Sequence, residues 1–409
     1  MLHESDDMLT PYDFFAPNRI VFGWGRRAEI GAIARSLGTR AFVVGGSRTL
    51  DRNGVMDELC RWMQSAGVTV ERLVTQAREP EVADVDATVA RLREANVRDG
   101  DLVVAIGGGS AIDLAKAVAA LATNTHGESV RDFLEGVGRG LKIERPPLPL
   151  LAVPTTSGTG TEATKNAVIS AFDPPFKKSL RSDLMVPKAV LVDPELTLSL
   201  PRMTTAHTGM DAITQLIESL ISRRAKPIPR ALCWQGLELA LPAMFKLAHD
   251  LGHRAAREAM SHAALLSGIA LANSGLGFAH GVAAALGVQA HVPHGLACAV
   301  MLPAALELNR DVALSDLAEL GRKSALWLCD ERDLPTLNVG VNDEAAAQHF
   351  IVVIRILTSK LDVPQHLAEL NVRQDQFAAL IKGSRGNSMD GNPCDVSDEE
   401  LHAILARMF

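Results

Sequence analysis

Three residues of the sequence have side chains suited to a divalent-cation site: Asp211, His280 and His294. His280 follows the glycine-rich run 275–277, and His294 stands between Pro293 and Gly295. One carboxylate and two imidazoles suit Zn²⁺ or Fe²⁺, because both cations accept oxygen and nitrogen ligands. The sequence therefore predicts a metal centre wherever the fold brings these three side chains together.

A second set of residues has the composition of a phosphate-binding loop. The run Gly107–Ser110 directly follows the apolar residues 102–106, and a helical pattern continues after it. Glycines let the backbone approach an anion closely, and the first turn of a helix offers free N–H groups. The order of strand, glycines and helix favours a pyrophosphate site over a plain turn. The run is not G-x-G-x-x-G, so it is not a standard Rossmann loop in detail.

Hydroxyl side chains cluster after another apolar run, at residues 148–153. The segment Pro154–Glu162 reads PTTSGTGTE. Ligands of open α/β sheets bind at the carboxyl ends of strands, which is where this segment is expected. Threonine and serine also cap helices. The number of hydroxyls exceeds the need of one cap and favours ligand contact.

The elements that must position these residues change in character along the chain. Strand-like runs alternate with helical patterns up to about residue 193. The expected strands are 20–23, 41–44, 68–73, 101–106, 148–153 and 189–193, and the expected helices include one ending at Leu37, one over 55–66 and one over 82–95. This alternation predicts an α/β fold with a parallel sheet.

From about residue 203 to the end the pattern is helical throughout. Pro194 and Pro201 interrupt regular structure in the segment that joins the two patterns, which places a domain boundary near 194–202. We therefore expect an α/β nucleotide-binding domain over 1–198 and an all-helical domain over 199–409.

The composition of the 409 residues is that of a globular protein, with 47% hydrophobic and 22% charged residues. A net charge of −7 without runs of like charge argues against nucleic acid or anionic membranes as partners. The five cysteines form no CxxC pair, which indicates reduced thiols and a cytoplasmic location. The acidic first residues predict no secretory signal, and no apolar run reaches the roughly 18–20 residues of a membrane span.

Six motifs together resemble the iron-containing (group III) alcohol dehydrogenase family, which shares its fold with glycerol dehydrogenase and dehydroquinate synthase. The motifs occur in family order over about residues 14–310: GGGSxxDxAK from Gly107, PTTxGTGxE from Pro154, DPxLT from Asp193, GMDA from Gly209, GxGxxH from Gly275 and PHG from Pro293. The family has an N-terminal α/β nucleotide domain and a C-terminal helical domain, in agreement with the patterns above. The resemblance implies that the active site lies in the cleft between them.

The resemblance implies that NAD(P) binds at the carboxyl edge of the sheet. The cofactor residues that it implies are Gly46, Ser47, Gly107, Gly108, Gly109, Ser110, Asp113, Thr155, Thr156, Thr159, Asn166 and Lys177. Within this set the glycines hold the pyrophosphate, the threonines flank the nicotinamide half, and Asn166 and Lys177 contact ribose.

The choice between NAD and NADP depends on the residues after the second strand. The run Gly45-Gly46-Ser47-Arg48 has no acid at the strand end. Small residues followed by an arginine accept a 2′-phosphate, so we expect NADP to be preferred. Asp51 is the alternative acid that would favour NAD.

The resemblance also implies that Asp211, His280 and His294 hold Fe²⁺ or Zn²⁺. The family's usual histidine four residues after the aspartate is Gln215 in this chain. Residues four apart share a helix face, so Gln215 is expected as a weak fourth ligand or as a donor to the substrate oxygen. Ala284 replaces a histidine that many members use in proton transfer, and His291 is a candidate to replace it.

These residues predict reversible hydride transfer between a small alcohol or aldehyde and NAD(P), with the cation polarising the substrate oxygen. A metal-independent reductase of the maleylacetate reductase type is an alternative. A nucleotide-binding protein with decayed catalysis is another. A cyclising lyase of the dehydroquinate synthase type shares the fold, but the threonine motif argues against it. Family members commonly form dimers, so we expect a homodimer or larger homo-oligomer.

Overall fold

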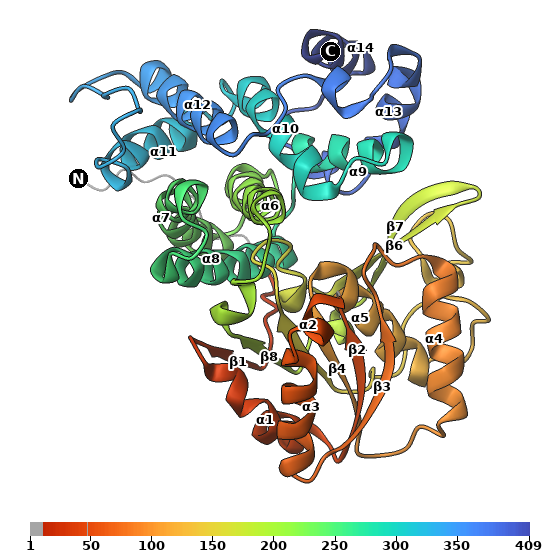
Figure 1. Cartoon of the computed structure of the whole chain (residues 1–409). Helices are drawn as coiled ribbons and strands as arrows, with labels where there is room; N and C mark the ends of the chain where they lie inside the picture. Colours follow the sequence, from red (N-terminus) through yellow and green to blue (C-terminus); the bar gives the residue numbers. More distant parts are fainter. Residues whose placement is uncertain (1–10, 47) are drawn as a thin grey trace.

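The computed structural model describes residues 11–46 and 48–409. Ser47 lies outside the described residues, and so do the first ten, on which the expectation about a secretory signal rests. A parallel sheet with its helices forms the N-terminal half, and helices α6 to α14 form the C-terminal half above it (Figure 1). The predicted fold class is confirmed.

The main sheet has six parallel strands in the order β1-β8-β5-β4-β2-β3. Their bounds are β1 Arg19–Phe22, β2 Arg40–Gly45, β3 Thr69–Thr75, β4 Asp101–Gly107, β5 Leu150–Pro154 and β8 Ala189–Val192. Each of them coincides with a strand expected from the sequence. The carboxyl ends of β2, β4 and β5 lie at one edge, which therefore carries both the glycine run and the threonine run.

Helices cover both faces of this sheet. Alternate residues of a strand point to opposite faces. Val103 and Ala105 of β4 pack with α4 (Val82–Glu94) and α5 (Gly109–Thr123), whereas Leu102 and Val104 pack with α1 (Ile30–Leu37) and α3 (Val55–Ser65). Burial on both faces explains why β4 is a continuous apolar run without alternation.

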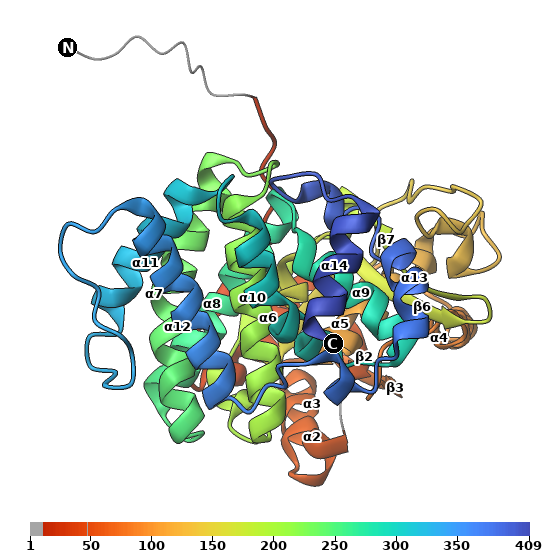
Figure 2. The same ribbon diagram turned by 90° about the horizontal axis from the view of Figure 1, so that it is seen from above.

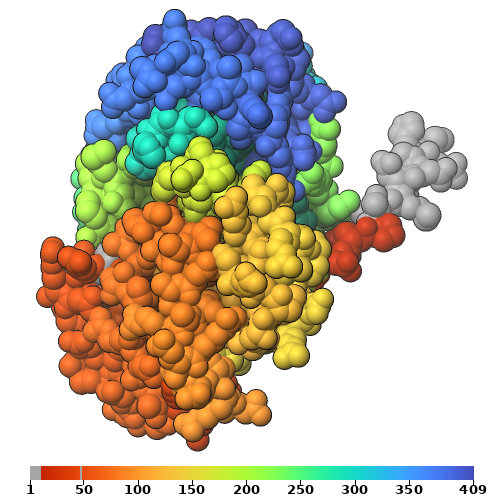
Figure 3. Space-filling view, turned by 90° about the vertical axis from the view of Figure 1, so that its right-hand side faces the viewer, coloured from red at the N-terminus to blue at the C-terminus, as the bar shows by residue number. Residues whose placement is uncertain are grey.

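A two-stranded hairpin, absent from the sequence-based expectations, projects from the N-terminal half. Its strands β6 (Asn166–Phe172) and β7 (Pro175–Arg181) are antiparallel. The hairpin reaches α9 of the other half, and the ring of Phe172 lies 5.6 Å from the ring of His291. Figure 3 shows the yellow-green hairpin against the cyan atoms of α9.

The C-terminal half is helical throughout the described residues, as predicted. Its helices are α6 Arg202–Ile221, α7 Pro227–His249, α8 Arg254–Asn273, α9 Phe278–Ala290, α10 His294–Asn309, α11 Leu314–Trp327, α12 Asp343–Lys360, α13 Phe377–Gly383 and α14 Asp398–Met408. Figure 2 shows α6, α9 and α10 from above, with α5 and the strands beneath them. In the part of the chain that the structure describes, no single helix is long and apolar enough to cross a membrane, although the pair α8–α9, bent by 98°, meets that length and composition together.

The two halves share a small apolar interface. Val190 and Val192 of β8 pack with Leu265 and Ile269 of α8. The side chain of Asn273 accepts from the Phe15 N–H at 2.5 Å and donates to its carbonyl at 2.7 Å. Strand β8 ends at Val192 and α6 begins at Arg202, so the connection spans the predicted boundary region. The boundary at residue 198 itself stays a prediction.

Candidate functional site

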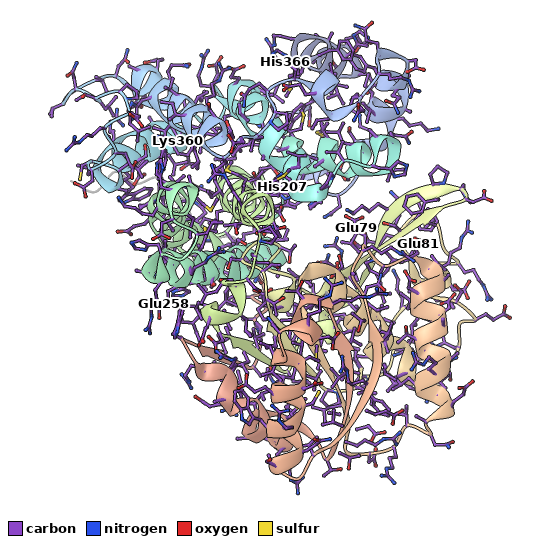
Figure 4. The ribbon with its side chains drawn as sticks, in the orientation of Figure 1. Glu79, Glu81, His207, Glu258, Lys360 and His366 are labelled. Carbon is purple, nitrogen blue, oxygen red and sulfur yellow. The ribbon has the colours of Figure 1, made fainter. Side chains whose placement is uncertain are left out.

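A cleft of about 1550 Å³ separates the carboxyl edge of the sheet from the helical half. Figure 4 labels Glu79 on the lower wall and His207 of α6 on the upper wall, and both line the cleft. Of the residues predicted to bind cofactor or metal or to act in catalysis, the cleft is lined by Gly46, Gly108, Gly109, Ser110, Asp113, Thr155, Thr156, Thr159, Asn166, Lys177, Asp211, Gln215, His280, His291 and His294. The fold therefore gathers nearly all of the candidates around one space.

The glycine run is needed for close packing as well as for open N–H groups. A Cβ on Gly46 would lie 2.7 Å from Cα of Gly107, and a Cβ on Gly109 would lie 2.7 Å from Cγ2 of Thr159. Gly107 lies behind the cleft wall, buried against Gly46. Gly108 is the N-cap of α5, so the first N–H groups of that helix point toward the cleft edge where an anion would bind.

A buried lysine ties the threonine segment to α5. The Lys116 ammonium is 1% exposed and donates to the carbonyls of Thr161, Thr164 and Asn166 and to the Thr164 hydroxyl. Its Nζ lies 2.7 Å from both the carbonyl oxygen and the hydroxyl oxygen of Thr164, and 3.0 Å from the carbonyl oxygen of Asn166. Lys116 therefore fixes the backbone that presents Asn166 to the cleft.

Two carboxyl groups beside this lysine have pKa values above their ordinary range. Burial raises the pKa of Asp113 to about 6 and that of Glu162 to about 7, and burial lowers the pKa of Lys116 to about 8. The Thr161 hydroxyl donates to Asp113 at 3.4 Å. The cofactor side of the cleft thus contains acids that remain largely protonated in mildly acidic solution.

Replacing Glu162 with glutamine should raise stability at alkaline pH. The folded protein binds the Glu162 proton with a pKa of about 7, above the ordinary 4.5, so folding loses stability as pH rises through this interval. Between pH 5 and pH 8 the variant should gain up to about 3 kcal/mol over the wild type. Urea unfolding at both pH values measures this, with the exposed Glu144→Gln as control. An equal gain at both pH values would contradict the assigned shift.

The predicted metal residues come together at the top of the cleft. Nε2 of His280 lies 3.3 Å from Oδ1 of Asp211, and Nε2 of His294 lies 3.8 Å from the same oxygen. Asp211 comes from α6, His280 from the first turn of α9 and His294 from the start of α10. The ligand atoms of these residues and of Cys298 all lie within 4.8 Å of one another.

Asp211 and His294 already have the protonation that a cation requires, whereas His280 would have to release a proton. Burial alone would lower the pKa of His280, but its contacts with Cys298, Asp211 and Glu218 raise it well above its ordinary value. Burial and the Lys177 ammonium lower the pKa of His294 to about 4, so its imidazole is neutral at pH 7. Burial alone would raise the pKa of Asp211, but the hydrogen bond with His280 and the charges of both histidines hold it below its ordinary value. A neutral imidazole and an ionised carboxylate are the forms that bind metals. The donor set therefore fits Fe²⁺ or Zn²⁺.

Glu218 supports the cluster and was missed in the sequence. It accepts hydrogen bonds from the N–H groups of Gly277 and Ala279 at 3.0 and 2.6 Å, and contacts Nδ1 of His280 at 2.7 Å. A carboxylate on Nδ1 fixes the ring so that Nε2 faces the metal position. Glu218 lies seven residues after Asp211, two turns along the same face of α6, and that spacing could have indicated it.

The remaining candidates contact the cleft in less direct ways. The Oε1 atom of Gln215 accepts from the Ser267 hydroxyl at 2.8 Å, and its Nε2 donates to the Thr159 carbonyl at 3.3 Å. His291 is the exposed C-cap of α9, with a positive φ of 55°. The roles predicted for Gln215 and His291 stay predictions.

Comparisons with known proteins agree with this geometry. Residues 17–194 match the family model described as iron-containing alcohol dehydrogenase, and residues 205–409 match the model of the family's C-terminal part. The probable alcohol dehydrogenase EutG of Escherichia coli strain K12 is 34% identical over 78% of this chain and 79% of its own length. Long-chain-alcohol dehydrogenase 1 of Geobacillus thermodenitrificans is 32% identical over 96% of both chains.

A solved structure extends the agreement to three dimensions. The crystal structure of a 1,3-propanediol oxidoreductase superposes with a TM-score of 0.87 at 28% identity, covering 98% of this chain and 100% of the other. The fold of both halves is thus shared with that oxidoreductase. The chain belongs to the iron-containing alcohol dehydrogenase family and is an NAD(P)-dependent oxidoreductase that acts on CH–OH groups.

Proposed function

We propose that this chain interconverts a small alcohol and its aldehyde with NADP(H), using a divalent cation held by Asp211, His280 and His294. The observation that carries the proposal is the convergence of these three side chains from three helices onto one wall of the cleft. The glycine and threonine segments form the facing wall. Cofactor and metal residues are therefore opposed across one space, as hydride transfer requires.

The residues of the chain act by positioning and by charge. When bound, the nicotinamide exchanges the hydride and the cation polarises the substrate oxygen. Asp211 supplies the negative charge that offsets the cation, and Glu218 orients His280. Gln215 and Lys116 hold the threonine segment through Thr159 and Thr161. The role of Gln215 in this proposal is to fix that segment.

The preference for NADP rests on the end of β2. Asp51, the acid that would otherwise bind a ribose hydroxyl, forms an ion pair with Arg72. Arg48 is exposed at the start of α2 (Arg48–Arg52), beside the cleft-lining residue Thr49. An arginine without a competing acid favours a 2′-phosphate. This arrangement supports NADPH over NADH as the preferred donor.

The substrate end of the cleft is lined by small residues of α9. Gly281, Ala284 and Gly287 all line it, so space is left beside His280. His291 ends this helix and is the candidate for proton exchange with solvent in place of the missing histidine at Ala284. These residues support a small alcohol or aldehyde as substrate.

Metal analysis and a coenzyme oxidation screen test the proposal together. The purified protein should contain stoichiometric metal and oxidise NADPH with short aldehydes, with kcat/KM at least about tenfold higher for NADPH than for NADH, equal to about 1.4 kcal/mol. Chelation should abolish turnover, and re-addition of the cation should restore it. Turnover that survives complete metal removal would support a metal-independent reductase, and cofactor binding without turnover would support decayed catalysis.

The cellular setting is part of the same proposal. All five cysteines lie in the described residues and are free thiols, which supports a cytoplasmic protein. We propose a homodimer or larger homo-oligomer, in keeping with the family. Light scattering of the purified chain measures this state directly.

A further inference from the structure

The metal-binding cluster contains a fourth donor atom that does not belong to the set inferred from the family. Cys298 is fully buried on α10, one helical turn after His294, so both side chains lie on the same face of that helix. Its Sγ lies 3.8 Å from Nε2 of His294. The Sγ atom is one of four donor atoms, with those of Asp211, His280 and His294, that lie within 4.8 Å of one another.

The spacing of these atoms matches a metal coordination shell. Metal–ligand bonds of about 2.0–2.3 Å in tetrahedral geometry place neighbouring ligand atoms about 3.3–3.8 Å apart. The observed separations are 3.3 Å from His280 to Asp211, 3.8 Å from His294 to Asp211 and 3.8 Å from Cys298 to His294. Three of the six separations therefore already lie in the range of a coordination shell, and none of the other three exceeds 4.8 Å.

Gln215 competes poorly for the same position. Its amide oxygen accepts from the Ser267 hydroxyl and its amide nitrogen donates to the Thr159 carbonyl, so both ends of the amide are engaged away from the cluster. A neutral amide carbonyl is also a weaker ligand for a borderline cation than a thiolate. Where the family has a histidine, this chain has a glutamine and, from another helix, a thiol.

We propose that Cys298 is the fourth protein ligand and that the resident cation is Zn²⁺, held by Asp211, His280, His294 and Cys298. This inference rests on the proposed function, because it refines the identity of the same centre. Thiolate ligands favour zinc over harder divalent cations. Zinc in catalytic sites also accepts a fifth ligand, so four protein ligands are compatible with a reacting centre.

Cobalt substitution of the full-length protein tests the sulfur ligand by spectroscopy. The wild-type protein loaded with Co²⁺ should show a thiolate-to-cobalt charge-transfer band in the near ultraviolet. Cys298→Ser should lose this band and keep the visible d–d bands of cobalt bound to the remaining ligands. Cys233→Ser, which changes another fully buried cysteine of the helical half, should keep both sets of bands.

Zinc affinity provides a second measurement. Cys298→Ser should weaken Zn²⁺ binding by at least about tenfold, equal to about 1.4 kcal/mol. Gln215→Ala should change it by less than about threefold, or about 0.7 kcal/mol. A competition titration with a chromogenic chelator measures both variants.

The outcomes separate this inference from the proposed function. Wild-type protein that binds cobalt with visible bands but without the near-ultraviolet band would overturn the sulfur ligand and leave the metal centre intact. A band that persists in Cys298→Ser would overturn the assignment to Cys298. Wild-type protein that binds neither Co²⁺ nor Zn²⁺ would overturn the inference together with the metal-dependent function. If Cys298→Ser fails to fold, the presence or absence of the near-ultraviolet band in the wild-type spectrum still decides whether sulfur is a ligand.

Discussion

Asp211→Asn should empty the metal centre and lower kcat/KM by at least about a thousandfold, equal to about 4 kcal/mol of transition-state stabilisation. Asp211 is the only carboxylate among the four converging donors and is 2% exposed. Asparagine keeps the volume but removes the charge that offsets a divalent cation. The buried centre would then hold a 2+ ion with one negative charge fewer among its ligands, which is costly.

Metal analysis after dialysis and steady-state kinetics measure the two effects of Asp211→Asn. Asp311→Asn, at a fully solvated position after α10, controls for the substitution itself. Circular dichroism must show that the variant keeps its helices. Full metal content or wild-type kcat/KM in a folded Asp211→Asn protein would contradict the role assigned to this residue.

Glu218→Gln should weaken metal binding by about 10–100-fold without removing any ligand. The carboxylate contacts Nδ1 of His280 at 2.7 Å and accepts the N–H groups that begin α9. Glutamine has one acceptor oxygen, and its NH₂ group faces donors that it cannot satisfy. The free energy of unfolding should therefore also fall by about 1–3 kcal/mol.

An excess of metal ions distinguishes Glu218→Gln from Asp211→Asn. Saturating Zn²⁺ or Fe²⁺ should restore most of the turnover of Glu218→Gln, because its ligands are intact, and should not restore Asp211→Asn. Chelator competition gives the dissociation constants, and Glu319→Gln on the exposed face of α11 serves as control. A Glu218→Gln protein with unchanged affinity would show that the carboxylate acts only in folding.

The parts of the fold that depend on local sequence were predictable. Strands β2 and β4 are apolar runs buried on both faces and followed by glycines, and such runs have few alternative structures. The hairpin was missed because Lys177 and Lys178 break the apolar pattern of β7. Its position against α9 depends on contacts such as that of Phe172 with His291, which no local pattern contains.

The candidate site likewise contains residues that the local sequence predicts and residues that only the fold reveals. Asp211, His280 and His294 could be predicted to act together because carboxylate and imidazole side chains beside glycines are distinctive, and the structure brings the three close to one another. Glu218 acts through backbone N–H groups about sixty residues away, and only the fold reveals such a partner. Gln215 shares a helix face with Asp211, but the direction of its amide is set by Ser267 and Thr159 from other elements.

The contact between Gly46 and Gly107 limits how the cofactor site can be engineered. Their backbones are so close that a methyl group on either would have to displace the other strand, with separations of 2.7 and 2.6 Å from the neighbouring Cα. A redesign that changes the coenzyme preference must therefore leave Gly46 and Gly107 unchanged. It has to use a side chain outside this contact, such as the exposed Arg48 at the start of α2.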